Sequence, residues 1–98
     1  MRTSIVVNPD IMQCAVCCKT YELQWHHIIH GTANRALSNR YRLTCWLCMS
    51  CHELLHSSRS PYWREVDAQL KATAQRQFEN RYGHDKWMEI FKKNYIDD

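Results

Sequence analysis

Five side chains near the middle of the chain have types and spacings that suit metal chemistry. Cys48 and Cys51 have the C-x-x-C spacing with which two thiolates bind one zinc ion. His52 and His56 are four residues apart, so a helix would present both imidazoles on one face. The same stretch matches H-E-x-x-H, a metalloprotease motif in which Glu53 would be the general base. A structural metal and a catalytic metal are therefore both open readings.

A second C-x-x-C pair, Cys14 and Cys17, lies upstream, and two such pairs are typical of a tetrahedral zinc site. We see no secretion signal and expect reduced thiols in the cytoplasm, which favours metal over disulfides. Cys18 could replace Cys17, and Cys45 also forms a C-x-x-C pair with Cys48. We treat Cys18 and Cys45 as bystanders, because an alternating strand would carry Cys45 away from the turn. The predicted zinc ligands are Cys14, Cys17, Cys48 and Cys51.

The adjacent histidines at 26 and 27 can complete a second site. Neighbouring residues on a strand point to opposite faces, so one imidazole can bind metal while the other addresses a substrate. His52 and His56 lack a third ligand, and three protein ligands with open positions make a catalytic site. His30 follows in a turn, where an exposed loop histidine is commoner than a phosphate contact.

The elements that must position these residues can be read from periodicity and turn signals. Residues 21–29 and 43–47 are rich in strand formers and predict two strands. The polar residues 32–42 between them predict a loop with one helical turn. Helical spacing begins near residue 49 and ends at 57–58. Residues 5–7 suggest a short edge strand.

The C-terminal part predicts two helices. Ser60 suits an N-cap and Pro61 the first helical position, and apolar residues then recur at three- and four-residue steps through 62–82. Gly83 suits the end of this helix. A shorter helix follows near 85–93. Aromatic residues at core spacing, which predict packing and not base stacking, are Trp63, Phe78, Trp87 and Phe91.

Charge adds a preference for a polyanionic partner. The net charge is +3, and the first 60 residues hold all of the excess, with six Lys and Arg against three Asp and Glu. A phosphate backbone would be attracted to that half. The candidate phosphate contacts are Arg35, Arg40 and Arg42, which lie between the two predicted strands; a solvated loop is the alternative. No apolar run is long enough to span a membrane.

The combined pattern resembles a known family. The run Cys-x-x-Cys, His-His-Ile, then Leu-Cys-x-x-Cys-His-x-x-x-His is similar to the HNH (ββα-metal, His-Me finger) endonucleases, above all the small phage and prophage proteins. Gly31, Arg35, Leu47 and the closing Ile90-Phe91-x-x-Asn94-Tyr95 also fit. The resemblance covers roughly residues 14–95.

The resemblance implies an α+β fold in a single domain, residues 1–98. A zinc-stabilised ββα-metal core would occupy 14–57, and a C-terminal helical extension 61–95. The activity implied is hydrolysis of DNA phosphodiester bonds, by nicking or double-strand cutting. Structural Zn²⁺ is expected in the cysteine site, and one catalytic Mg²⁺, Mn²⁺, Ni²⁺ or Zn²⁺ in the histidine site. By analogy, phage packaging or recombination proteins are further partners.

The resemblance also assigns roles within the histidine site. His26, His52 and His56 would be the ligands of the catalytic cation, and His27 the general base, with an ordinary pKa that suits proton transfer near neutrality. The family's central Asn falls at Leu43, so Asn39 is the candidate substitute.

Two rival functions stay open. A zinc-bound module that only binds DNA explains the cysteines but leaves the histidines without a role. The metalloprotease explains His52, Glu53 and His56 but neither the C-x-x-C pairs nor His26 and His27.

Overall fold

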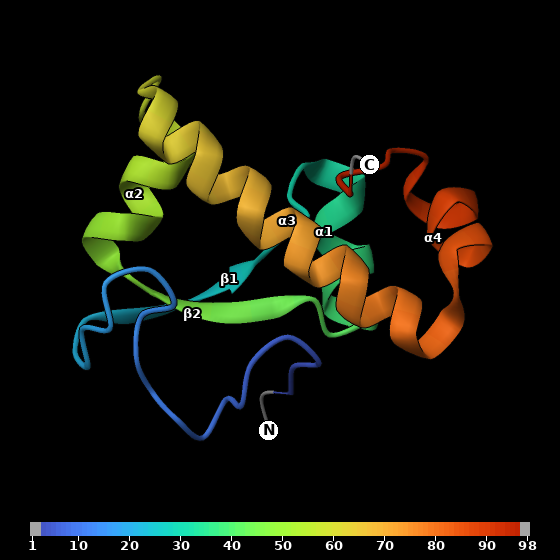
Figure 1. Cartoon of the computed structure of the whole chain (residues 1–98). Coiled ribbons are helices and arrows are strands. Elements are labelled where there is room, and N and C mark those ends of the chain that lie inside the picture. The colour runs from blue at the N-terminus through green and yellow to red at the C-terminus, as the bar shows by residue number, and fades with distance from the viewer. Residues whose placement is uncertain (1–2, 97–98) are drawn as a thin grey trace.

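A two-stranded antiparallel sheet lies at the centre of the fold in the computed structural model of this chain, which describes residues 3–96 (Figure 1). Strand β1 (Leu23–His27) pairs with β2 (Thr44–Cys48) so that Trp25 is opposite Trp46 and His26 opposite Cys45. β2 is buried along its whole length. β2 therefore forms a buried base for the residues next to it.

Four helices accompany the sheet in residues 3–96, so the predicted α+β class is confirmed. α1 (Thr32–Arg40) connects the two strands, and α2 (Met49–Ser57) continues directly from β2. α3 (Pro61–Tyr82) is the longest helix, and α4 (His84–Phe91) follows it after one residue. In Figure 1, α2 and α3 lie on one side of the sheet and the N-terminal segment on the other. Within residues 3–96, no helix has the length and apolar character needed to cross a membrane.

One continuous core joins the sheet to the C-terminal helices. Phe78 of α3 and Trp87 of α4 are fully buried, and their ring centroids lie 5.3 Å apart. Trp87 also stacks on Phe91 at 4.1 Å. The same cluster contains Leu43, which immediately precedes β2, and Cys14 of the N-terminal part. The predicted core aromatics therefore pack as expected, and the C-terminal helices support the sheet.

The helix signals in the second half of the sequence are confirmed. The Ser60 side chain accepts a hydrogen bond from the Tyr62 N–H at 3.3 Å, and Pro61 is the first residue of α3. Gly83 separates α3 from α4 with φ 89°, a backbone angle that favours glycine. β1 is shorter than the predicted 21–29, because Glu22 has φ 55°, which a strand does not allow.

The loop prediction for residues 32–42 is wrong, because Thr32–Arg40 form the helix α1. Gly31 precedes it with φ 107° and makes no side-chain cap, so the usual N-cap signal is missing from the sequence. Only a narrow face is covered: Ser38 is buried and Leu37 half-buried, while most of the other side chains of α1 are exposed. A surface helix with so little apolar area reads as a polar loop.

The edge-strand prediction for residues 5–7 is also wrong. Ser4 Oγ accepts hydrogen bonds from the N–H groups of Val6 at 3.0 Å and Val7 at 3.2 Å. This local turn uses the amides that a strand ladder would need. The Ser4 hydroxyl itself donates to the Thr44 carbonyl at 2.5 Å, which holds the segment against β2.

Candidate metal centre

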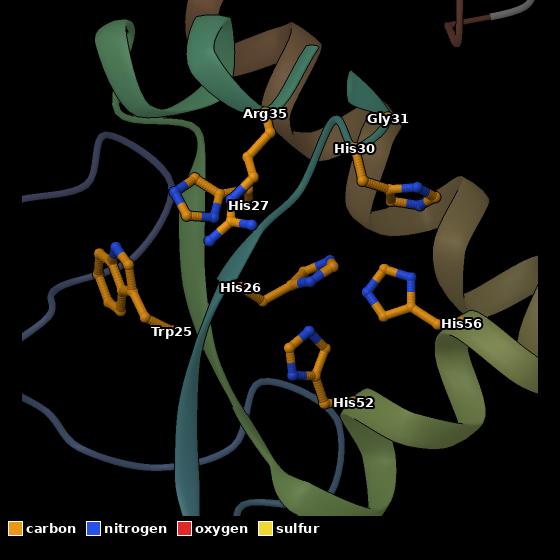
Figure 2. Close-up of a pocket in the computed structure, with 8 residues that line it drawn as sticks. All are labelled: Trp25, His26, His27, His30, Gly31, Arg35, His52 and His56. Carbon is orange, nitrogen blue, oxygen red and sulfur yellow. The ribbon is translucent and has the colours of Figure 1, made fainter. Parts of the chain in front are cut away.

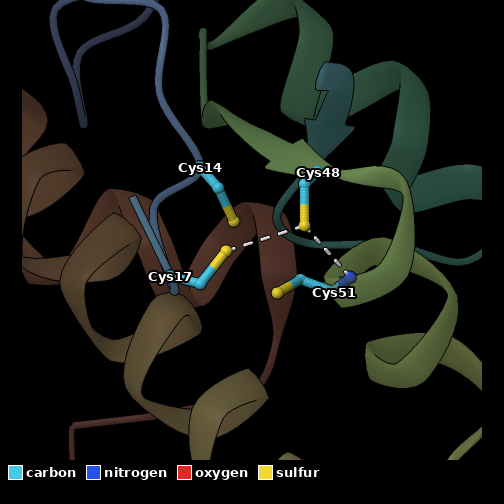
Figure 3. A group of neighbouring side chains, drawn as sticks. All are labelled: Cys14, Cys17, Cys48 and Cys51. Atoms are coloured by element: carbon cyan, nitrogen blue, oxygen red, sulfur yellow. Dashed lines mark hydrogen bonds between the residues drawn. The ribbon is translucent and has the colours of Figure 1, made fainter. Parts of the chain in front are cut away.

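Four cysteine sulfurs come together at the junction of β2 and α2 (Figure 3). Cys14 and Cys17 come from a turn before β1, and Cys48 and Cys51 from the last residue of β2 and the first turn of α2. All four sulfurs lie within 4.8 Å of one another, and those of Cys17 and Cys48 are 3.7 Å apart. A tetrahedral zinc ion about 2.3 Å from each sulfur sets them about 3.8 Å apart. The four cysteines therefore fit a metal ion such as zinc.

Backbone N–H groups favour the thiolate at Cys14, whereas burial raises the pKa of the Cys51 thiol. The Val16 N–H donates to Cys14 Sγ, and the Cys51 N–H donates to Cys48 Sγ, both at 3.4 Å. Burial alone would raise the pKa of Cys14, but backbone N–H groups of Cys17, Cys48 and Val16 bring it down to about 7. Such N–H donors are typical of C-x-x-C turns that prepare sulfur to bind a cation.

Cys18 and Cys45 lie outside this group. Cys18 is exposed with φ 65°, and its N–H donates to the Cys14 carbonyl at 2.9 Å. Cys45 is buried within β2, where burial and then the neighbouring Cys14 raise its pKa to about 12. Neither sulfur belongs to the group of four, which is formed by the residues predicted from the two C-x-x-C pairs.

Three histidines form a second group. His26 comes from β1, and His52 and His56 lie one turn apart on α2 (Figure 2). One ring nitrogen of each lies within 4.8 Å of those of the other two. His26 is 1% exposed, and its buried Nε2 has no hydrogen-bond partner among the described residues. Because interiors rarely leave such an atom unpaired, a metal ion is the partner that this geometry fits.

The imidazoles of this group are in the protonation state that metal binding requires. Burial, and then the neighbouring His52 and His56, lower the pKa of His26 to about 3. Burial also comes first among the causes that lower the pKa values of His52 and His56. All three rings are therefore neutral at pH 7, and each keeps a nitrogen lone pair for a cation.

Gln24 orients one of these histidines, a role for which the sequence contains no local signal. Its side-chain oxygen lies 2.6 Å from His52 Nδ1, across 28 residues of sequence. An amide oxygen can only accept, so Nδ1 carries the proton and Nε2 keeps the lone pair. Outer contacts of this kind set the tautomer and orientation of metal-binding histidines.

Replacing Gln24 with alanine is expected to lower the affinity of the histidine group for a divalent cation about 10- to 100-fold. The reason is that His52 would lose the acceptor that fixes its tautomer. Calorimetric titration of the zinc-loaded chain with Ni²⁺ measures the change. Gln69→Ala is the matched control, because Gln69 is exposed on α3 and its side chain bonds only Glu65 among the contacts described. Equal affinity in the two variants would rule out this role of Gln24.

A cleft of about 380 Å³ lies over the three histidines. Figure 2 shows His27 and Arg35 along one side of the histidine group and His30 on another. The residues that line the cleft are Trp25, His26, His27, His30, Gly31, Arg35, His52 and His56. Glu53 is exposed on α2 and is not among them. The cleft therefore brings a cationic side chain and a half-buried imidazole next to the three-histidine group.

His27 alternates with His26 on β1 and is half-buried. Burial lowers its pKa, the Arg35 cation lowers it further, and a hydrogen bond with the Asn39 side chain acts in the opposite direction. His27, Arg35 and Asn39 also line a shallow hollow beside the main cleft. The ring of His27 is thus neutral at pH 7 and able to accept a proton.

The other predicted residues lie farther from the cleft lining. Arg40 is exposed with its guanidinium 5.6 Å from the Tyr41 ring centroid, and Arg42 is exposed at the end of the same connection. Leu43, at the position where HNH endonucleases carry a central Asn, is fully buried in the core. Asn39 is the residue of this connection that reaches His27.

A buried serine takes a structural role near the cleft that sequence reasoning missed. Ser38 of α1 donates to the Ile29 carbonyl at 2.6 Å and accepts from the Ile29 N–H at 3.1 Å. This paired contact fixes α1 against the segment that follows β1. It therefore sets where Arg35 and Asn39 stand relative to His27.

Comparison with known proteins gives one informative similarity. The chain is 32% identical over 62 residues to an uncharacterised 91 kDa protein in a cob intron of Schizosaccharomyces pombe. The match includes 55% of this chain but only 8% of that protein, so the chain corresponds to a small part of its relative. No protein-family model and no solved structure matches the chain.

Proposed function

We propose that this chain is a metal-dependent DNA endonuclease of the HNH (ββα-metal, His-Me finger) type. One observation carries the proposal: His26 has a buried, unpartnered Nε2 among the described residues, directed to a group that also contains His52 and His56. The neutral imidazole of His27 and the cation of Arg35 line the same cleft. Phosphodiester hydrolysis needs three parts: imidazoles that can hold a metal ion, a general base and a side chain that binds the phosphate anion.

The chain's own residues divide the chemistry as follows. His27 accepts a proton from a water molecule, and the resulting hydroxide attacks the phosphorus. The bond to the 3′ oxygen breaks, and this oxygen takes up a proton from solvent water to become the 3′-hydroxyl. Arg35 binds non-bridging oxygens of the phosphate, and Asn39 holds His27 in place. His26, His52 and His56 would hold a divalent cation, which would supply positive charge for the oxygens that become more negative. The products carry 5′-phosphate and 3′-hydroxyl ends.

The remaining parts have supporting roles in this proposal. A structural zinc on the four cysteines fixes the start of α2, and α2 presents His52 and His56. Arg40 and Arg42 bind the DNA backbone outside the cleft. The intron location of the relative supports a nuclease, since endonucleases are often encoded in introns.

The metalloprotease alternative is less well supported, because Glu53 is exposed and lies outside the cleft lining. The test assays the wild type, His56→Ala and Glu53→Gln on supercoiled plasmid and on a peptide substrate with added divalent cations. A nuclease predicts that the wild type and Glu53→Gln cut the plasmid, that His56→Ala does not, and that the peptide stays intact. Peptide cleavage that is lost in Glu53→Gln would instead establish the protease. DNA binding without cleavage would favour the non-catalytic module.

A further inference from the structure

A fourth histidine lies against the metal group and is held by a carboxylate from α3. His30 lines the same cleft as His26, His52 and His56. Its ring centroid is 4.9 Å from that of His56, the separation that also joins His52 to His56, and 6.1 Å from that of His26. His30 thus belongs to the cleft by position, although its nitrogens are not within the closest group of three.

The contact with α3 determines which nitrogen of His30 is available. His30 Nε2 lies 3.2 Å from Asp67 Oδ1, across 37 residues of sequence. The other oxygen of Asp67, Oδ2, lies 2.7 Å from Lys71 Nζ, so the carboxylate is held from both sides. A carboxylate with a lysine partner accepts hydrogen bonds, so Nε2 carries the proton. With Nε2 donating to the carboxylate, Nδ1 is the nitrogen of His30 left to bind a metal ion.

An imidazole that donates one N–H to a carboxylate and keeps the other nitrogen unprotonated is the arrangement of a metal-binding histidine. The ring of His30 stands beside the imidazoles of His26, His52 and His56 in the cleft. The half-burial of Asp67 and Lys71, with side chains 21% and 16% exposed, limits competition from water for this contact.

We propose that His30 is a fourth imidazole donor to the divalent cation of the histidine group, and that Asp67 of α3 is the residue that positions it. This inference rests on the proposed function in one respect, namely that the histidine group is a metal centre. It gives the helical extension a part in the site, because α3 supplies the orienting carboxylate. A donor set of four nitrogens favours ions such as Co²⁺, Ni²⁺ and Zn²⁺ over Mg²⁺.

The test measures metal binding directly and does not depend on DNA cleavage. The zinc-loaded full chain is titrated with Co²⁺ while its visible absorption is recorded, for the wild type, His30→Ala, His30→Gln and Asp67→Ala. His30→Ala and His30→Gln are expected to lower Co²⁺ affinity at least about 10-fold and to change the absorption bands, and Asp67→Ala to lower affinity by a smaller factor.

The matched control is His84→Ala, because His84 makes a similar pair with Glu79 at 2.7 Å on the exposed surface between α3 and α4. Its Co²⁺ affinity and spectrum should equal those of the wild type. Retained zinc and an unchanged circular-dichroism spectrum show that each variant is folded. Wild-type affinity and bands in both folded His30 variants would overturn the proposal. A wild type that binds Co²⁺ through His30 but cuts no DNA would refute the nuclease and leave this inference intact.

Discussion

Replacing His27 with alanine is expected to lower the rate of DNA cleavage about 10²- to 10⁴-fold, the usual contribution of a positioned general base. Burial, and then the neighbouring Arg35 cation, lower the pKa of His27, so its ring is neutral. Five histidines line the cleft among the described residues. Four of them are proposed donors to the cation, so His27 is the one left to act as the base. Single-turnover cleavage of a plasmid under saturating metal measures the loss.

The same variant should bind the divalent cation as the wild type does, since His27 lies outside the three-histidine group. It should also retain DNA affinity, because Arg35, Arg40 and Arg42 are unchanged. This separation distinguishes a lost base from a lost metal. A His27→Ala chain that cuts DNA at the wild-type rate would remove His27 from the mechanism, and one that no longer binds the cation would make it a ligand.

Replacing Cys48 with serine is expected to abolish structural zinc binding and, with it, the folded state. Structural zinc contributes on the order of 10 kcal/mol in small zinc-binding peptides, whereas domains are stable by only about 5–15 kcal/mol in total. Serine keeps the N-cap that Cys48 provides to Cys51, so the cap itself is not the cause of the loss. Zinc content and thermal unfolding of the purified chain measure the effect.

Cys18→Ser is the matched control for this variant. Cys18 is exposed and lies outside the four-sulfur group, although it neighbours Cys17. The Cys18→Ser chain should retain zinc in the cysteine site and the wild-type unfolding temperature. If Cys48→Ser folded with an unchanged melting temperature and no zinc, the cysteines would have no structural metal role.

The elements that the sequence predicted well are those with local signals. α3 was predicted because Ser60, Pro61 and Gly83 mark its ends within a few residues of the chain. α2 is predicted from the helical spacing that begins near residue 49. α1 was missed because Gly31 provides no capping side chain and the helix covers only a narrow face. The strand expected at residues 5–7 was wrong because the Ser4 hydroxyl bonds the amides of Val6 and Val7.

The residues of the candidate site differ in the same way: those with local sequence patterns are predicted, and those with distant partners are not. The two C-x-x-C pairs and the His52–His56 spacing are local patterns, and the structure brings each set together. Gln24 and Asp67 were missed because their partners, His52 and His30, are 28 and 37 residues away in sequence. Only the folded chain brings such pairs together. The position of Leu43 in the motif likewise does not show whether its side chain lies in the core or in the site; the fold places it in the core.

The most direct test is cleavage of supercoiled plasmid by the purified wild-type chain, with structural zinc retained and Mg²⁺, Mn²⁺, Ni²⁺ or Zn²⁺ added in turn. The account predicts nicked or linear DNA with 5′-phosphate ends in the presence of at least one of these ions. It predicts no cleavage when the added ion is chelated while the cysteine site stays loaded. Plasmid that is bound but remains intact with all four ions would contradict the account and leave a DNA-binding zinc module.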